Sequence, residues 1–318
     1  MTKSPLARKK ISPTRVRYIK LGEGGSWEKE CLEKGIVRIG FGSAQSERFE
    51  LCQSGRWNDL SESFIAEGKV KGTATRFTNE LRLFFEDEGS MLWITFMGER
   101  LYWGMVDHAK PALHADANGV WRPIRDGWQC TDLNEEELTK DRLSGALTKL
   151  TAYRGTSCNV DVDVSDYVIR RINGEKTPEV ERALAASKEM KVSALDLMRL
   201  LGPHDFELLV DLVFTTSGWQ RVGSVGGMQK TLDLDLILPS TGERAFVQVK
   251  SETTSAELAE YVAKIGDGPY DRMFYVFHSS KAETNDPRDP RVTVIGPEKL
   301  ADLVMDAGLV SWLIRKVS

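Results

Sequence analysis

The most restrictive feature of the sequence is residues 231–252, TLDLDLILPSTGERAFVQVKSE, where apolar and polar side chains alternate on both sides of the tetrapeptide PSTG. A period of two is typical of β-strands, because successive side chains point to opposite faces of a sheet. Proline and glycine favour a turn, so the two strands are predicted to lie side by side. Strands this apolar belong inside a domain, where polar side chains need partners.

The polar side chains of this strand pair are predicted to share one face of the sheet. Asp233 and Asp235 alternate with leucines in the first strand, and Gln248 and Lys250 alternate with valines in the second. Two carboxylates, an amide oxygen and an ammonium group could then meet at one edge. Such oxygens suit a hard cation such as Mg²⁺, and a nearby lysine can orient water or offset charge on a phosphate.

A helix predicted before this strand pair supplies another candidate. In DFELLVDLVFTTSG the apolar residues recur at helical spacing, and Glu207 stands between two large apolar residues. A buried carboxylate without a partner is costly. We therefore expect Glu207 to contact the polar edge of the sheet, through either a metal ion or Lys250.

A charged segment without aromatic residues, 172–203, separates two halves of different character and is predicted to be a helical linker. The chain of 318 residues is long enough for two domains. Residues 204–318 alternate helix and strand, which predicts an α/β domain with a central mixed sheet flanked by helices. Residues 21–171 predict an α+β or β-barrel domain with one or two helices, including a hairpin in SMLWITFMGERLYWGMV.

The N-terminal arm, residues 1–20, is basic and contains no acidic residue. Such an arm can follow a phosphate backbone, or it can be a solvated tail. The net charge of −4 argues against a uniformly basic nucleic-acid-binding protein.

Several other classes of protein and site are not expected. The sequence has no run of about 18–20 apolar residues and no apolar signal-peptide core, so we expect a cytoplasmic protein without membrane contact. The four cysteines are far apart, which predicts neither a disulfide framework nor a zinc site.

Residues 204–318 resemble the Mrr-like branch of the PD-(D/E)XK, or restriction-endonuclease-like, nucleases. FELLVDLVFTTSGW is similar to the first helix of that family, DLIL to its acidic strand and FVQVK to its Gln-x-Lys strand. RMFYVFHSS and RVTVIGPEKLADLV are similar to its closing strands and helix. The resemblance implies a phosphodiester hydrolase, an endodeoxyribonuclease that uses Mg²⁺, for which Mn²⁺ can substitute.

The resemblance also implies roles for individual residues. Glu207 would be the helix acid, Asp235 the main metal ligand and Gln248 a neutral metal ligand in place of the usual acid. Lys250 would position the attacking water. The family often has glycines just before its acidic strand residue, whereas KTLD stands here, which leaves the choice between Asp233 and Asp235 open.

The first half resembles the PUA-like barrels, especially those of the EVE and YTH type. The resemblance rests on the strand–helix–strand start, the basic arm and the LWITF…LYWG hairpin. It implies an aromatic pocket that takes a flipped or single-stranded modified base. The base-binding candidates are Trp27, Phe41, Trp57, Trp93 and Trp103. For each of them alone, an ordinary core position is the alternative.

Together the two halves predict a metal-dependent DNA endonuclease of the modification-dependent, type IV-like restriction kind, acting in defence against phage or other foreign DNA. Its partner would be modified DNA, and a homodimer is expected because double-strand cutting needs two active sites. One alternative is a non-catalytic reader of modified DNA or RNA with a degenerate nuclease fold, and a third option is an RNA-processing nuclease. Failure of Glu207, Asp235, Gln248 and Lys250 to converge would favour the reader.

Overall fold

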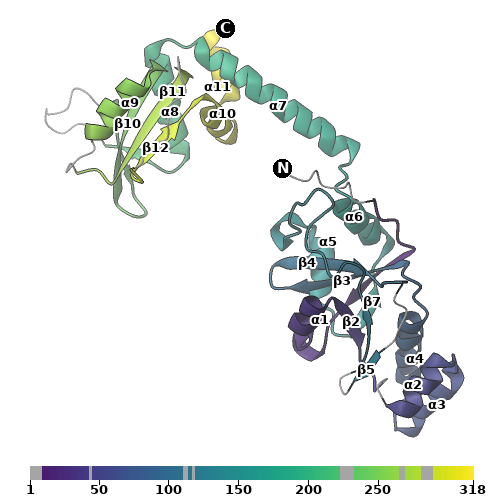
Figure 1. Ribbon diagram of the computed structural model, residues 1–318. Helices are drawn as coiled ribbons and strands as arrows, with labels where there is room; N and C mark the ends of the chain where they lie inside the picture. Colours follow the sequence, from purple (N-terminus) through teal and green to yellow (C-terminus); the bar gives the residue numbers. More distant parts are fainter. Residues whose placement is uncertain are drawn as a thin grey trace, which may run out of the picture. The chain divides into compact units, whose positions relative to one another are not determined.

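The chain divides into two compact units, Met1–Thr177 and Pro178–Ser318 (Figure 1). The second unit begins with helix α7, Pro178–Arg199, so most of the segment predicted as a linker is a helix of this unit. No helix within the described residues is long and apolar enough to cross a membrane. The computed structural model describes residues 9–42, 45–109, 114–116, 119–222, 233–264, 269–280 and 289–318.

The first unit contains two sheets and more helix than expected. Its strands are β1 Arg15–Ile19, β2 Ile36–Ile39, β3 Met91–Met97, β4 Arg100–Met105, β5 His114–Asp116, β6 Gly119–Pro123 and β7 Ser157–Asn159. Its α-helices are α1 Glu28–Lys34, α2 Ser46–Gln53, α3 Trp57–Ala66, α4 Lys71–Phe85, α5 Gly145–Thr148 and α6 Val162–Ile172. Short 3₁₀ turns are η1 Glu23–Gly25, η2 Lys140–Arg142 and η3 Lys149–Ala152.

The larger sheet of the first unit has the strand order β4-β3-β1-β7, and the smaller has the order β2-β6-β5. Strands β3 and β4 form the predicted hairpin, which is confirmed, with Met97 opposite Arg100. The parallel pair β1 and β3 joins the beginning of the unit to this hairpin. Two apolar clusters form the core. One packs helices α1 to α4 against strand β2, and the other packs helix α6 against β1, β3 and β4.

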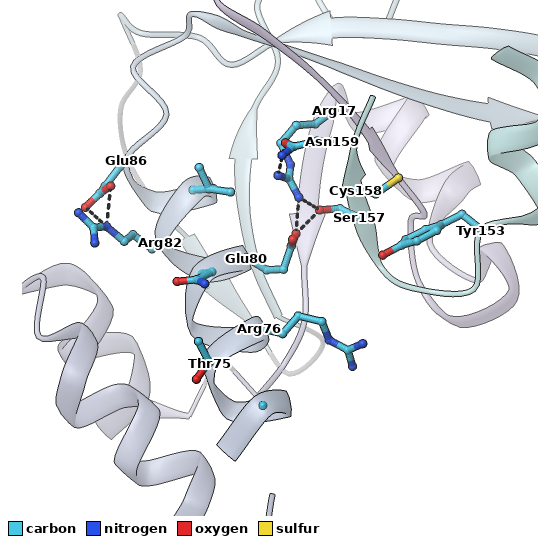
Figure 2. A pocket seen from close by; sticks show the side chains of 13 residues that line it. Arg17, Thr75, Arg76, Glu80, Arg82, Glu86, Tyr153, Ser157, Cys158 and Asn159 are labelled. Atoms are coloured by element: carbon cyan, nitrogen blue, oxygen red, sulfur yellow. Dashed lines mark hydrogen bonds and ion pairs between the residues drawn. The ribbon is translucent and has the colours of Figure 1, made fainter. Parts of the chain in front are cut away.

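Part of the basic arm belongs to the fold of the first unit. Residues 1–8 lie outside the described residues, but from Arg15 the chain is strand β1, as its alternation predicts. Arg17 is only 1% exposed. Its guanidinium group donates to Glu80 at 2.6 Å, to Ser157 at 2.6 Å and to Asn159 at 2.8 Å (Figure 2). Arg17 therefore joins β1, α4 and β7 and cannot follow a phosphate backbone as a free arm would.

The second unit is a five-stranded mixed sheet between helices. Its sheet has the order β12-β11-β10-β9-β8, in which β10, β11 and β12 are parallel and β9 is antiparallel to both neighbours. The strands are β8 Gln220–Arg221, β9 Leu234–Leu238, β10 Glu243–Thr253, β11 Arg272–Ser280 and β12 Val292–Ile295. The helices are α7, α8 Pro203–Thr216, α9 Ser255–Lys264, α10 Pro297–Asp306 and α11 Val310–Val317.

Different helices pack against the two faces of this sheet. Val247 and Val249 point into the large core with helices α7, α8, α10 and α11. Phe246 and Tyr275 instead pack against Leu258 of helix α9. Side chains alternate along a strand, so Gln248 and Lys250 of β10 lie on the α9 face with Phe246. The expectation of a central mixed sheet flanked by helices is confirmed for this unit.

Candidate functional site

Strands β9 and β10 bring Asp233, Gln248 and Lys250 to the α9 face of the sheet, and these three residues are called the sheet cluster below. The turn after Leu238 pairs the strands antiparallel. The Asp233 carboxylate accepts a hydrogen bond from the Gln248 side-chain amide and another, at 2.7 Å, from the backbone N–H of Val249. The carboxylate beside Gln248 is therefore that of Asp233.

Asp235 makes different contacts. It lies opposite Phe246, two residues further from the Lys250 end of β10. Its carboxylate accepts hydrogen bonds from Arg244 at 3.2 and 3.3 Å, and burial together with the charge of Asp235 raises the pKa of the Tyr270 hydroxyl. The Arg244 guanidinium carbon lies 5.6 Å from the centre of the Tyr270 ring. Asp235 is thus part of an ion pair at the turn end of the strands, and the structure favours Asp233 as the acid of the sheet cluster.

Lys250 is held by aromatic and acidic neighbours. Its Nζ lies 5.3 Å from the centre of the Tyr261 ring on helix α9, and it hydrogen-bonds to the Tyr261 side chain. Burial acts to lower the pKa of Lys250, but Tyr261 and Asp233 outweigh this effect and raise it above the ordinary value. The ammonium group is therefore charged at neutral pH. No sequence motif identifies Tyr261 as a neighbour of Lys250.

Burial raises the pKa of the Asp233 carboxyl above its ordinary value. The hydrogen bond from Val249, the charge of Lys250 and the hydrogen bond from Gln248 oppose this effect without cancelling it. A buried carboxylate that resists ionisation in this way would gain from a nearby cation, because the cation favours the charged form.

The surroundings of the Gln248 side chain indicate whether a cation could bind at the sheet cluster. The residue is 2% exposed, and its Oε1 is buried without a hydrogen-bond partner among the described residues. An unpaired buried amide oxygen is costly, and one carboxylate and one amide oxygen suit Mg²⁺ if water and substrate phosphate complete the shell. The described residues contain no group of three or more acidic, histidine or cysteine side chains that could hold a metal. The sheet cluster thus fits a weakly held Mg²⁺ rather than a tightly caged one.

Glu207 does not join the sheet cluster through any described contact. It lies on helix α8, which packs against the opposite face of the sheet through Phe206 and Val210. The side chain is half-buried, and none of the described residues makes a hydrogen bond or ion pair with it. The predicted contact between Glu207 and Lys250 is not among the described interactions, and the half-buried carboxylate is accessible to water.

In the first unit, Trp27 and Phe41 line a hollow of about 400 Å³, called the aromatic hollow below. The Trp27 ring fits between two glycines. A Cβ atom on Gly22 would come within 2.9 Å of the ring, and one on Gly40 within 3.4 Å. Gly22 also has φ +82°, a left-handed conformation that favours glycine. The backbone is therefore shaped to hold this ring.

Phe41 has an unusual backbone conformation. Its φ is +62°, which for a bulky residue costs about 1–2 kcal/mol because Cβ crowds the following carbonyl. Its ring lies 4.4 Å, centre to centre, from that of Phe77 on α4. Strain of this kind is often kept where it holds a side chain for function. The backbone conformation and the Phe77 contact together fix the position of the Phe41 ring.

Charged groups complete the aromatic hollow. Lys20 and Arg154 line it together with Glu23 and the backbone of Gly155. The buried Arg38 guanidinium carbon lies 5.7 Å from the centre of the Trp27 ring. A flat aromatic wall with nearby cations is able to stack a nucleobase and contact its phosphate.

The other three base-binding candidates do not line this hollow. Trp93 is 1% exposed, and its indole N–H donates to Asp87 at 2.9 Å. Trp103 is 7% exposed and donates to the carbonyl of Thr131 at 2.8 Å. Trp57 is half-buried and packs edge-on to Phe85 in the core. Trp93 and Trp57 have the contacts of core residues, whereas Trp103 also lines a separate hollow of about 560 Å³ together with Lys9 and Arg125.

The four cysteines have no described role in either site. Cys31 and Cys52 are buried, and burial raises their pKa values to about 11 and about 12. Both are therefore neutral thiols at physiological pH, so they are poor nucleophiles and poor metal ligands.

Comparisons of the chain with family models, curated proteins and solved structures found no match.

Proposed function

We propose that this protein is a metal-dependent DNA endonuclease that cuts DNA carrying a modified base. The observation that carries the proposal is the sheet cluster, because it combines an acid, a buried unpaired amide oxygen and a charged lysine on one face of a sheet. The resemblance of residues 204–318 to Mrr-like nucleases points to the same chemistry. The proposal takes Asp233, rather than Asp235, as the acid.

Asp233 and Gln248 would hold the cation through one carboxylate and one amide oxygen. Bound Mg²⁺ would polarise the phosphodiester and lower the pKa of a coordinated water. The Lys250 ammonium group would stabilise the negative charge that develops on the phosphate as water attacks phosphorus and the P–O bond breaks. Tyr261 would keep that ammonium in place. Cutting both strands would require a second copy of the chain.

The aromatic hollow would select the substrate. Trp27 and Phe41 would stack on an extruded base, while Lys20 and Arg154 would neutralise its flanking phosphates. Unstacking a base costs a few kcal/mol, so such a hollow would favour bases that leave the stack easily or that fill it better when modified. The volume of about 400 Å³ is within the usual range of small-molecule sites.

A second candidate function is a non-catalytic reader of modified nucleic acid. Two observations favour it: Arg244 engages Asp235, and Glu207 makes no described contact with the sheet cluster. Of the four residues expected from the sequence, two acids, Glu207 and Asp235, thus lie outside the sheet cluster. The reader would keep the aromatic hollow and use the second unit for docking or dimerisation.

A cleavage and nicking assay separates the two functions. Plain, cytosine-modified and adenine-modified DNA would each be incubated with the full chain and Mg²⁺ or Mn²⁺, with Lys250→Ala as the control. The proposal predicts metal-dependent cutting of one modified substrate that the Lys250→Ala variant does not perform. Tight binding of modified DNA without cutting would instead identify a reader. Equal cutting of all substrates would retain the nuclease and reject base selection.

A further inference from the structure

A second concave surface of the first unit lies between helix α4 and the strands β1 and β7, and is called the α4 groove below. Its volume is about 800 Å³. Figure 2 shows the Arg76 and Arg82 side chains of helix α4, with Glu86 just after the helix, and Tyr153 and Asn159 from the segment that includes β7. The lining is mainly polar, with three arginines.

The floor of the α4 groove is a fixed network. Arg17 is held by Glu80, Ser157 and Asn159, and Ser157 also hydrogen-bonds to Glu80 (Figure 2). The charge of Glu80 is therefore matched by a buried arginine within hydrogen-bonding distance. An anionic ligand above this floor would not meet an unpaired carboxylate.

The rim supplies the positive charge. Arg82 donates from Nε to both carboxylate oxygens of Glu86, each at 3.0 Å, so Glu86 is also matched. Arg76 is exposed, and among the described residues it forms no ion pair. Its guanidinium carbon lies 5.5 Å from the centre of the Phe77 ring. Arg76 thus leaves the α4 groove with a net positive charge on a partly ordered side chain.

The α4 groove and the aromatic hollow are lined by neighbouring residues of the first unit. Arg76 lies over Phe77, and the Phe77 ring in turn packs against Phe41 of the hollow at 4.4 Å. The chain segment 153–159 serves both surfaces, because Arg154 lines the hollow and Tyr153 lines the groove. A strand that had one base in the hollow and continued past Arg76 would use both surfaces.

We propose that the α4 groove binds the phosphodiester backbone of the single DNA strand that flanks the extruded base, with Arg76 as the phosphate contact. The proposal rests on the base-reading part of the proposed function. Positively charged grooves beside aromatic platforms are typical of single-strand binding, where cations follow the backbone and rings stack on bases. The polar side chains of Asn79 and Asn159 would add uncharged contacts to phosphate and sugar oxygens.

The test is the salt dependence of binding by the full chain. Fluorescence anisotropy would measure the affinity for a single-stranded DNA oligonucleotide, plain or with one modified base, over a series of salt concentrations. Loss of one phosphate contact should reduce the slope of log affinity against log salt by about 0.7. We expect Arg76→Ala to lower the slope by about this amount and to weaken binding of both oligonucleotides several-fold. Arg76→Lys should restore most of the slope.

Arg142→Ala is the matched control, because Arg142 is an exposed arginine of the same unit outside the α4 groove. It should leave slope and affinity unchanged. An Arg76→Ala slope equal to that of Arg142→Ala would overturn the proposal, as would the absence of binding by the unaltered protein. Tighter, Arg76-dependent binding of RNA with the same sequence would overturn the assignment to DNA.

The oligonucleotide with a modified base separates the test of base reading from the test of backbone binding by the α4 groove. If the unaltered protein binds plain and modified DNA equally, base reading fails, while the slope still decides the role of the α4 groove. If discrimination is present but Arg76→Ala leaves the slope unchanged, base reading stands and the α4 groove is not the backbone site.

Discussion

The sheet cluster and the aromatic hollow are built on opposite kinds of backbone. Gln248 and Lys250 lie on strand β10 and Asp233 directly precedes its partner strand β9, so register and alternation place these side chains. The hollow lies where strands end, with Gly22 at φ +82° and Phe41 at φ +62°. Paired strands hold groups at fixed positions, which suits a reaction that depends on precise placement. Irregular connections can vary in shape, which suits recognition of a ligand.

The register of strands β9 and β10 is tested most sharply by comparing substitutions of Asp233 and Asp235. Asp233→Asn should reduce the rate of metal-dependent DNA cleavage by about 100-fold or more, because it removes the carboxylate that accepts a hydrogen bond from Gln248. Asp235→Asn should change the rate by no more than about threefold, because it weakens a partly exposed ion pair with Arg244 and leaves Asp233, Gln248 and Lys250 in place. Cleavage rates at saturating metal measure both. The reverse order of effects would identify Asp235 as the metal ligand.

Much of the sheet cluster can be predicted from the sequence. Alternation correctly predicts the pairing of β9 with β10 and the shared face of Gln248 and Lys250. It does not predict the register, because that depends on how many of the four residues 239–242 belong to the turn. The observed pairing of Leu238 with Glu243 puts Asp233 beside Gln248. A different turn would exchange the two aspartates.

The aromatic hollow and the basic arm are harder to predict, because both depend on contacts between distant segments. The resemblance to PUA-like barrels makes five aromatic residues base-binding candidates, and within the described residues Trp27 and Phe41 line one hollow together. Arg17 belongs to a basic run in the sequence, yet its partners Glu80 and Ser157 are 63 and 140 residues away. No local pattern encodes that burial.

A second prediction separates aromatic residues of the core from those of the hollow. Trp93→Phe should lower the free energy of unfolding by about 1–3 kcal/mol, because it leaves a buried oxygen of Asp87 without its indole donor. The preference for modified over plain DNA should not change. Urea unfolding and a binding assay measure the two quantities. A variant of normal stability that no longer prefers modified DNA would instead place Trp93 in the binding site.

The third prediction uses the raised pKa of Asp233. The carboxylate must be ionised to hold a cation, so Mg²⁺ or Mn²⁺ binding should weaken as pH falls through a pKa above the ordinary value of 3.8. Calorimetric titration with Mn²⁺ between pH 4 and pH 8 would measure this, with Asp233→Asn as the control. Metal affinity that stays constant down to the ordinary aspartate pKa would contradict the assignment.

The raised pKa of Asp233 also affects the stability of the metal-free protein. Low pH favours folding through this group, whereas high pH favours metal binding. Because the folded-state pKa of Asp233 is raised, the protonated form favours folding. That contribution is fully present below the unfolded-state pKa and is lost as pH rises through the folded-state pKa. Asp233→Asn should remove this part of the pH dependence of unfolding.

The most direct test of the account is whether selection and cutting reside in different units. Trp27→Ala and Lys250→Ala would each be measured for binding preference between modified and plain DNA and for the cleavage rate. We predict that Trp27→Ala loses about 1–3 kcal/mol of the preference and that Lys250→Ala keeps the preference while its cleavage rate falls about 100-fold or more. Normal cleavage by Lys250→Ala, or an unchanged preference in Trp27→Ala, would contradict it.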